Sequence, residues 1–519
     1  MADVIYYNGT VYTVDSSFTI AQAFAVTDGK IIDVGTNEQI KKNDAKEKID
    51  LNGKTVYPGF IDPHSHFYGY STDMLKCNLY GTKSFEDMLE KVKSFSITNK
   101  FNWILGRGWD QNDWDKKEFP DKKILDSLFP NTPVYLMRVD GHATLCNQKA
   151  LDIAGIVPQT KIAGGSVEVE NGKCSGILID NAVDSLKKFI PHFTDEVIAE
   201  TLERGEKNCF EVGLTTVCDA GLPRDSLETL DSLQKAGKLK IRIYAMISFE
   251  DADKKYYFAK GKSKTDRLNI CSFKIYADGA LGSRGACLLQ PYADKPDYYG
   301  MLLHDVNYFK DAAREIYDNG FQLCTHAIGD SANRLMLNVY GEVLKEKNDR
   351  RWRIEHCQNI NENDFDLFGK YSIIPSVQPT HATSDMYWIE TRLGKERMKG
   401  ANAYKQLMEQ NGMIANGSDF PVESINPLFG FYAAVVRKDQ NNFPENGFQM
   451  ENSLTREEAL KGMTIWAAYA NFEEKEKGSI EKGKFADFVI LEDDIMKIAP
   501  EKIFSVKVKA TYLNGEKVF

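Results

Sequence analysis

The sequence predicts an α/β protein: a (β/α)8 TIM barrel, a small β-sandwich domain formed from both chain ends, and an insertion after the first barrel strand. Eight apolar strand-like runs lie in the middle of the chain, and helical patterns separate them, which is the order of parallel βα units. Short strand-like runs with tight turns stand at both ends. Several internal runs end in a histidine, as expected where barrel strands deliver functional side chains to one mouth.

The two chain ends are expected to form one β unit. Asp28-Gly29 marks a turn between two strand-like runs near the start, and Asn514-Gly515 marks a similar turn near the end. Such dipeptides favour the tight turns of β-hairpins, because both residues tolerate a positive φ. We therefore expect residues 1–55 and 478–519 to form the β-sandwich domain and residues 56–477 to form the barrel domain.

The barrel strands are expected at eight places, and a long gap separates the first two. That gap is about 150 residues, against the ~30 of an ordinary βα unit, so residues 80–190 are expected to be an insertion that caps the mouth. The expected strands are Val56–His66, Thr215–Asp219, Ile241–Ile247, Phe273–Asp278, Gln322–His326, Arg351–Cys357, Ser372–Val377 and Met413–Asp419. The expected helices include Phe85–Ser94, Glu196–Val212, Tyr308–Asn319 and Ala332–Lys345.

Composition and charge exclude several functional classes. With 42% hydrophobic and 27% charged residues, the chain of 519 residues has an ordinary globular composition and is long enough for an enzyme. Its formal net charge of -10, without a basic stripe, argues against a nucleic-acid partner. There is no signal-like start and no apolar run of ~18 residues, so we expect a cytoplasmic chain with no membrane partner. Nine cysteines without a CxxC pair indicate reduced thiols.

Histidines at strand ends are the first chemical signal. His64 and His66 end the first barrel strand, and residues two apart on a strand face the same side, so both imidazoles can bind one cation. His326 and His356 also end apolar strands, so four of the eight histidines are expected at one mouth. Each alone could be a core histidine that only satisfies hydrogen bonds, but the four together favour a metal site.

Two further residues fit the same chemistry. Asp419 ends the last strand and could act as a metal ligand, as a proton shuttle for the attacking water, or as the cap of the following helix. Lys274 shares a strand face with Tyr276 and Asp278, and a lysine inside a barrel needs a partner. That partner could be Asp278, or the amine could have reacted with carbon dioxide to give a carbamate that bridges two metals.

Short motifs occur in order along the chain and point to one family. They are Pro58-Gly59-Phe60-Ile61-Asp62, Gly108-Trp109-Asp110, Asp140-Gly141-His142, Ala277-Asp278-Gly279-Ala280-Leu281-Gly282-Ser283-Arg284, Thr325-His326-Ala327-Ile328-Gly329-Asp330 and Gln378-Pro379-Thr380-His381. With the histidine, lysine and aspartate strands in barrel order, the sequence resembles the amidohydrolase superfamily, and more narrowly the amidohydrolase 3 family. The similarity spans nearly the whole chain and includes Gly478-Ser479-Ile480 near its end.

The resemblance implies a ligand set. His64 and His66 would bind a first divalent metal, and His326 and His356 would bind a second. Lys274, as a carbamate, would bridge the two ions. The resemblance implies Zn2+, with one or two ions per chain, although Mn2+, Fe2+ or Co2+ would also suit such ligands.

The resemblance also implies a reaction at this site. Asp419 would contact the metal and the attacking water, and would pass the proton of that water to the departing nitrogen. His381, after the seventh strand, is a candidate to polarise the substrate carbonyl.

Residues near the mouth are candidate substrate contacts. Those in the insertion could equally serve packing. Arg284 could hold an anionic group of the substrate. The candidates are Trp109, Asp110, Arg138 and His142 in the insertion, and Asp278 and Arg284 after the fourth strand.

The expected function is therefore that of a metal-dependent hydrolase, which cleaves a non-peptide carbon–nitrogen bond of a small amide or formamide-like molecule. Two alternatives stay open. The chain could be a non-catalytic regulatory or scaffold protein on the same fold, or its metal site could act on a lactone, ester or phosphoester. The substrate itself and the oligomeric state, with a homodimer as one option, are not determined by the sequence.

Overall fold

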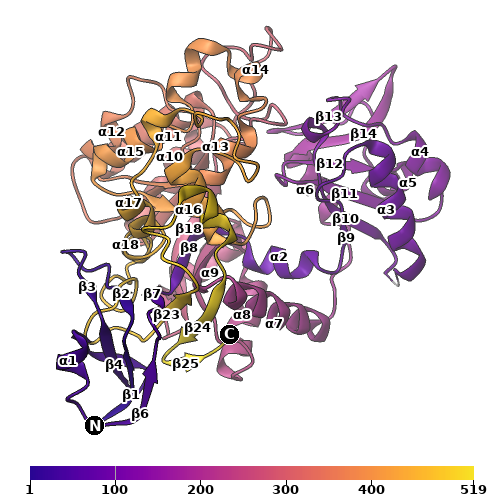
Figure 1. Cartoon of the computed structure of the whole chain (residues 1–519). Helices are drawn as coiled ribbons and strands as arrows, with labels where there is room; N and C mark the ends of the chain where they lie inside the picture. Colours follow the sequence, from indigo (N-terminus) through magenta and orange to yellow (C-terminus); the bar gives the residue numbers. More distant parts are fainter. Residues whose placement is uncertain (100) are drawn as a thin grey trace.

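A computed structural model describes residues 1–99 and 101–519 of the chain (Figure 1). Its centre is a nearly closed barrel of eight parallel strands, which confirms the expected fold class. The strands follow one another around the barrel in chain order. They are β8 (Phe60–Ser65), β15 (Leu214–Leu222), β16 (Arg242–Ser248), β18 (Leu268–Tyr276), β19 (Gln322–Ala327), β20 (Arg353–His356), β21 (Ile374–Val377) and β22 (Ala415–Asn416).

Backbone hydrogen bonds join the loop after β22 to the end of β8 and draw the first and last strands together. Asp419 N donates to His64 O at 2.8 Å, and His66 N donates to Phe420 O at 2.8 Å. Gly417 permits this approach, because a Cβ at that position would lie 2.8 Å from the His64 nitrogen. Closure of the barrel therefore brings His64 of β8, and His66 just after that strand, beside Asp419.

The alternation of strand residues separates an outer apolar layer from a polar interior. In β18, Phe273 and Ile275 belong to the main hydrophobic core beneath the helices, while Lys274 points to the other side, into the barrel. The helices that surround or connect the strands are α2 (Phe67–Asp73), α7 (Asp195–Glu211), α8 (Arg224–Lys235), α9 (Asp251–Lys260), α10 (Val306–Asp318), α11 (Asp330–Leu344), α12 (Asp366–Lys370), α13 (Pro379–Asp385), α14 (Ile389–Leu393), α15 (Tyr404–Asn411), α16 (Pro427–Val436), α17 (Arg456–Gly462) and α18 (Ile465–Ala470).

The expected first barrel strand, Val56–His66, is divided at Gly59. β7 (Thr55–Pro58) pairs with strands of the terminal unit, whereas β8 joins the barrel. Gly59 N donates to Asp487 O at 2.9 Å, and a Cβ on Gly59 would lie 2.3 Å from Thr215 Oγ1, so only glycine lets the chain cross between the two sheets here. The terminal unit thus extends to Pro58, past the expected boundary at residue 55.

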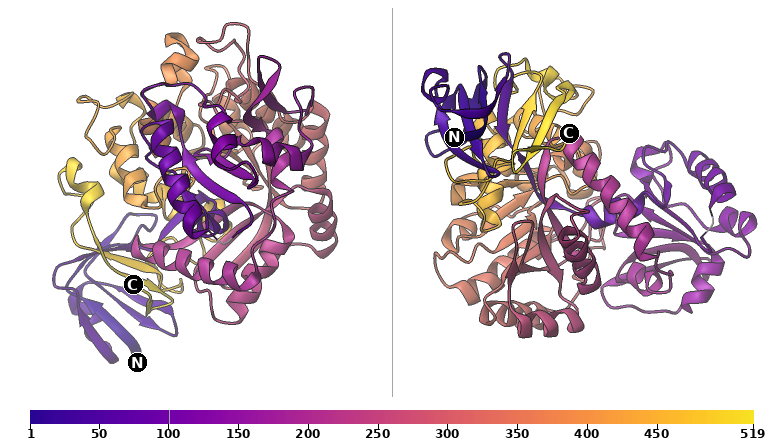
Figure 2. Two further views of the ribbon diagram at one scale, coloured as in Figure 1. Left: turned by 90° about the vertical axis from the view of Figure 1, so that its right-hand side faces the viewer. Right: turned by 90° about the horizontal axis from the view of Figure 1, so that it is seen from below.

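Both chain ends contribute to that terminal unit, and Figure 2 shows the two termini within it. One sheet has the order β5-β4-β1-β6 and the other the order β25-β24-β23-β7-β2-β3. Aromatic rings from both ends meet in one core, where the ring of Phe488 lies 5.0 Å from the ring of Tyr6 and 5.0 Å from the ring of Phe24. The remaining elements are β1 (Ala2–Tyr7), β2 (Thr10–Tyr12), β3 (Ile20–Ala21), β4 (Ala23–Thr27), β5 (Lys30–Gly35), α1 (Asn37–Ile40), β6 (Ala45–Asp50), β23 (Phe488–Leu491), β24 (Val508–Leu513) and β25 (Glu516–Lys517).

The segment between the first two barrel strands folds as a lobe beside the barrel (Figure 1). Its six-stranded sheet has the order β13-β14-β12-β11-β10-β9 and its own hydrophobic core on each face. Its elements are β9 (Cys77–Asn78), α3 (Phe85–Thr98), β10 (Ile104–Trp109), α4 (Lys123–Leu128), β11 (Val134–Arg138), β12 (Ala143–Cys146), α5 (Gln148–Ala154), β13 (Gly165–Glu170), β14 (Lys173–Asp180) and α6 (Asn181–Lys187).

No helix in residues 1–99 and 101–519 combines the length and the apolar character that crossing a lipid bilayer requires.

Candidate metal centre

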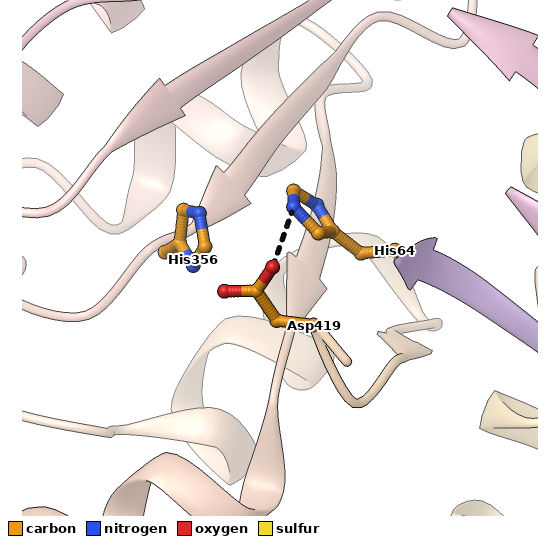
Figure 3. A group of neighbouring side chains, drawn as sticks. All are labelled: His64, His356 and Asp419. Atoms are coloured by element: carbon orange, nitrogen blue, oxygen red, sulfur yellow. Dashed lines mark ion pairs between the residues drawn. The ribbon is translucent and has the colours of Figure 1, made fainter. Parts of the chain in front are cut away.

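One group of side chains in the described part of the chain is close enough to hold a metal ion: His64, His356 and Asp419 (Figure 3). His64 lies in β8, His356 ends β20, and Asp419 follows β22. One ligand atom from each lies within 4.8 Å of the others, and His64 Nε2 is 3.5 Å from Asp419 Oδ1. All three side chains are buried. The barrel therefore gathers donors that lie up to 355 residues apart in the chain, from His64 to Asp419.

The other predicted ligands surround this group. His66 Nε2 lies 3.3 Å from Asp419 Oδ1, and the ring of His326 lies 4.5 Å from the ring of His356. Lys274 is buried on β18, which pairs with the strand that carries His326. The structure thus brings the whole predicted set to one mouth.

Unpaired nitrogens show that this site suits a cation. Each of the four is enclosed and has no hydrogen-bond partner. Leaving a buried polar group unsatisfied costs about 1–3 kcal/mol, so four in one place would be expensive unless they share a ligand. Neutral imidazole and carboxylate groups are the donors that divalent metals such as Zn2+ accept. The four nitrogens are His64 Nε2, Lys274 Nζ, His326 Nε2 and His356 Nδ1.

The protonation states of the clustered side chains favour metal binding at neutral pH. Burial, reinforced by the charge of Lys274, lowers the pKa of His64 to about 4, and burial also holds the pKa of His356 well below its usual value. Burial opposes ionisation of Asp419, but contact with His66 and the neighbouring imidazoles hold its pKa well below the usual range. His64 and His356 are therefore neutral and Asp419 is charged, which are the forms that bind metals.

Glu355 orients His64 and was not predicted as a site residue. His64 Nδ1 lies 2.6 Å from Glu355 Oε2, and Arg353 Nε lies 2.7 Å from Glu355 Oε1. Burial opposes ionisation of Glu355, but Arg353 and His64 lower its pKa to about 2. A carboxylate that accepts Nδ1–H leaves Nε2 free to face the metal. The sequence did carry a signal, because Arg353 and Glu355 share one face of a barrel strand.

The backbone is strained at two of the three clustered residues. His356 has φ 73° and Asp419 has φ 61°, both in the left-handed region. A residue with a side chain pays about 1–3 kcal/mol for a sparsely populated conformation, which persists only where the surrounding structure enforces it. The fold therefore holds both side chains in place at a local cost.

His142 is the insertion residue that reaches the metal centre. Its ring lies 5.0 Å from the ring of His326, and its Nδ1 lies 2.8 Å from Asp180 Oδ1. Burial lowers the pKa of His142. The hydrogen bond to Asp180 and the charge of that carboxylate together raise the pKa by more than burial lowers it, so the net shift is upward. Asp180 is a positioning residue that the sequence interpretation missed.

The other insertion candidates contact partners within the insertion. Trp109 is fully buried in the core of the insertion, where its Nε1 donates to Leu136 O at 2.8 Å, so it does not line the mouth in this conformation. Trp109 ends β10 with its side chain facing that core, which explains why it is buried there and not placed at the mouth. Arg138 is buried between Asp110 and Asp140, and both carboxylates pair with it. These charges satisfy one another, and a role in substrate binding stays a prediction for them.

The two candidates after β18 are also engaged. Asp278 accepts hydrogen bonds from the backbone N–H groups of Cys287, Ile328 and Gly329, which leaves its carboxylate little free acceptor capacity. Arg284 pairs with Asp294 at 2.9 Å, so its charge is already matched within the loop. A substrate contact by Asp278 or Arg284 stays a prediction.

His381 lies beside the ligand cluster. Its Nε2 is 3.8 Å from Asp419 Oδ2, and its ring stacks on His356 at 6.0 Å. Its Nε2 is also buried without a partner. It is therefore placed where a carbonyl oxygen bound at the metal centre could accept a hydrogen bond.

A separate cavity of about 390 Å³ lies near the amino-terminal ends of β18 and β19, lined by residues that include Lys262, Asn269 and Gln322. It shares no residue with the metal centre. Barrel enzymes carry their chemistry at the carboxyl-terminal ends of the strands, so we do not assign catalysis to this cavity.

Comparisons with known proteins agree with the geometry. The model of the Amidohydrolase family matches residues 47–519. The Bacillus subtilis (strain 168) protein YtcJ is 32% identical, over 99% of this chain and 99% of that protein. N-substituted formamide deformylase of Arthrobacter pascens is 26% identical, over 99% of this chain and 98% of that protein. The crystal structure of an uncharacterized metal-dependent hydrolase from Pyrococcus horikoshii OT3 matches with a TM-score of 0.78 and 26% identity, covering 96% of this chain and 99% of that one. The predicted resemblance is confirmed: this chain belongs to the amidohydrolase family.

Proposed function

We propose that this metal-dependent hydrolase cleaves a carbon–nitrogen bond other than a peptide bond, in a small amide or formamide-like molecule. The observation that carries the proposal is the convergence of four unpaired buried nitrogens around Asp419. Similarity to a formamide deformylase over almost the full length of both chains supports the choice of a carbon–nitrogen bond. A scaffold protein would have no need to keep such costly unpaired groups.

The cation that we propose is Zn2+, held by the histidines His64, His66, His326 and His356 together with Asp419. When bound, a divalent cation lowers the pKa of water and polarises a carbonyl group. Burial lowers the pKa of Lys274, although Glu355 and Asp419 oppose the shift. A neutral amine can form an N–C bond to carbon dioxide and release a proton to solvent. We therefore include a Lys274 carbamate in the proposed ligand set.

Two side chains would handle protons and charge during the reaction. Asp419 is ionised and lies at the centre of the cluster, so it can accept a proton from the attacking water and return it to the departing nitrogen. His381 can donate a hydrogen bond to the substrate carbonyl, where negative charge develops in the transition state. Departure of the nitrogen requires that proton, so loss of Asp419 should block bond cleavage more than substrate binding.

Metal content is the first test of this function. Untagged wild type, His64→Ala and Lys274→Ala would be compared by inductively coupled plasma mass spectrometry. His192→Ala is a matched control, because His192 is exposed and outside the cluster. We expect one or two ions per chain in wild type and in the control, and a sharp fall in the other two variants.

A substrate screen follows from that result. Formamides and N-acyl amines would be assayed beside lactones, esters and phosphoesters, so that the bond class is determined directly. Preferential cleavage of the amides would support the proposal, and preferential cleavage of a lactone or phosphoester would replace it. A wild type that binds no metal, even after reconstitution, would favour a scaffold protein.

A further inference from the structure

Gln378 lies at the barrel mouth between the strands that lead to two of the three clustered ligands, His356 and Asp419. It directly follows β21, which pairs with β20 on one side and with β22 on the other. β20 ends in His356, and Asp419 follows β22. Gln378 itself keeps an extended backbone, with φ −122° and ψ 95°, so the alternation of the strand continues through it.

That alternation directs the Gln378 side chain into the barrel. Ser376, two residues earlier, accepts a hydrogen bond from Arg353 Nη2 at 2.8 Å. Arg353 is fully buried and pairs with Glu355, the residue that orients His64. Ser376 therefore faces the interior, and Gln378 shares its face one layer closer to the mouth.

The carboxamide of Gln378 is buried and has no partner at either end. The residue is 1% exposed, and neither Oε1 nor Nε2 makes a hydrogen bond. Burial of such a group without hydrogen bonds costs about 1–3 kcal/mol, which a ligand with complementary polar groups would recover. A neutral amide is also not among the ligands that Zn2+ normally takes from a protein. Its natural complement is a group with one acceptor and one donor side by side.

We infer that Gln378 binds the amide group of the substrate, with Nε2 donating to the carbonyl oxygen and Oε1 accepting the substrate N–H. This inference rests on the proposed function and narrows it. The substrate class becomes amides that can place an N–H beside the carbonyl oxygen, such as primary amides and N-monosubstituted formamides bound in the cis conformer, over esters, lactones and N,N-disubstituted amides. His381 N donates to Gln378 O at 3.0 Å. Gln378, which would bind the amide, and His381, which would polarise the carbonyl, therefore lie on the same turn.

The test compares two substrates that differ in one group. Metal-loaded wild type and Gln378→Met would be assayed with an N-alkylformamide and with the formate ester of the corresponding alcohol. The ester offers the same carbonyl but no N–H. We expect Gln378→Met to lower kcat/KM about tenfold more for the formamide than for the ester, because only the amide loses both contacts.

Two further variants keep the result interpretable. Gln410→Met is the matched control, because Gln410 Nε2 contacts only Gln406 O of its own helix, at 3.3 Å, and the substrate ratio should stay at the wild-type value. Gln378→Asn withdraws the amide by one methylene and should give the same selective loss if Gln378→Met does not fold. Metal content and unfolding temperature are measured for every variant.

The outcomes separate this inference from the function on which it rests. In one outcome, wild type cleaves the formamide while the Gln378 variants lose activity equally on both substrates, or lose none. In either case Gln378 does not bind the substrate N–H, and the proposed function still stands. A wild type that cleaves no amide overturns both.

Discussion

The metal centre and the Arg138 cluster of the insertion (Arg138, Asp110, Asp140 and Gln111) both bury charged or polar side chains, but they satisfy them differently. Arg138 pairs with both carboxylates and donates to Gln111 Oε1 at 2.8 Å. At the metal centre, four buried nitrogens have no hydrogen-bond partner within the protein. A buried charge with matched partners holds structure together, whereas a group of unmatched donors indicates a ligand. The following predictions test that difference.

The largest expected effect is that of metal removal. Chelation of wild type should lower turnover at least about thousandfold, because a metal supplies several kcal/mol of transition-state stabilisation. Readdition of Zn2+ should restore the activity, measured as kcat on the best amide of the screen. Arg138→Met protein should respond to chelation and readdition as wild type does. Full activity after complete chelation would show that the unpaired nitrogens serve another purpose.

The Arg138 cluster should matter for stability and not for the metal. Arg138→Met leaves Asp110 and Asp140, which are only partly exposed, without their cation; breaking a fully buried pair costs about 3–5 kcal/mol, so we expect a loss of up to that size. Urea unfolding of the metal-loaded protein would measure the loss, and mass spectrometry would show unchanged metal content. A loss below about 1 kcal/mol would mean that solvent already reaches the cluster.

Glu355 combines features of the Arg138 cluster and of the metal centre, because it is paired with Arg353 and also orients the metal ligand His64. Glu355→Gln should weaken metal affinity about 10–100-fold, since His64 loses the carboxylate that fixes its tautomer. Competition with a chromogenic chelator would measure the affinity. Glu206→Gln is a matched control, because Glu206 is buried and accepts backbone N–H groups far from the site. Equal effects of the two variants would reduce Glu355 to a stabilising residue.

Arg284 should give the smallest effect. Its pairing with Asp294 is partly exposed, and Arg392 also pairs with that carboxylate, so Arg284→Met should change the free energy of unfolding by less than about 1 kcal/mol. Metal content should not change. A rise in KM for anionic amides alone would support the prediction that Arg284 binds an anionic group of the substrate. An unchanged KM would mean that Arg284 does not contact the substrate.

Local patterns in the sequence were sufficient for the barrel, and the resemblance to a family supplied the predicted ligand set. The strand at Phe273 and Lys274 was predicted because alternation is a local property that any single strand displays. His64, His66, His326 and His356 could be grouped because barrel strands all deliver their ends to one mouth. The division at Gly59 was missed because it depends on the close approach of Thr215, a residue of another strand.

The partners of the candidate residues could not be predicted. Trp109 and His142 both belong to polar and aromatic motifs of the insertion, yet one fills its core and the other reaches His326. Nothing in either motif indicates which face of the insertion meets the barrel. Glu355 stands next to a predicted ligand, but its role depends on His64, which is 291 residues away in the chain.

By itself, the sequence determined which residue types end which strands, and from that the fold class and the prediction of a metal-dependent hydrolase, because strand alternation and parallel βα order are repeated local signals. Only the tertiary structure decided which buried groups are paired and which are left open, at Arg138 on one side and at His64 and Gln378 on the other. The physical reason is that hydrogen bonds and ion pairs act over a few ångströms in space, and distance along the chain does not reveal them.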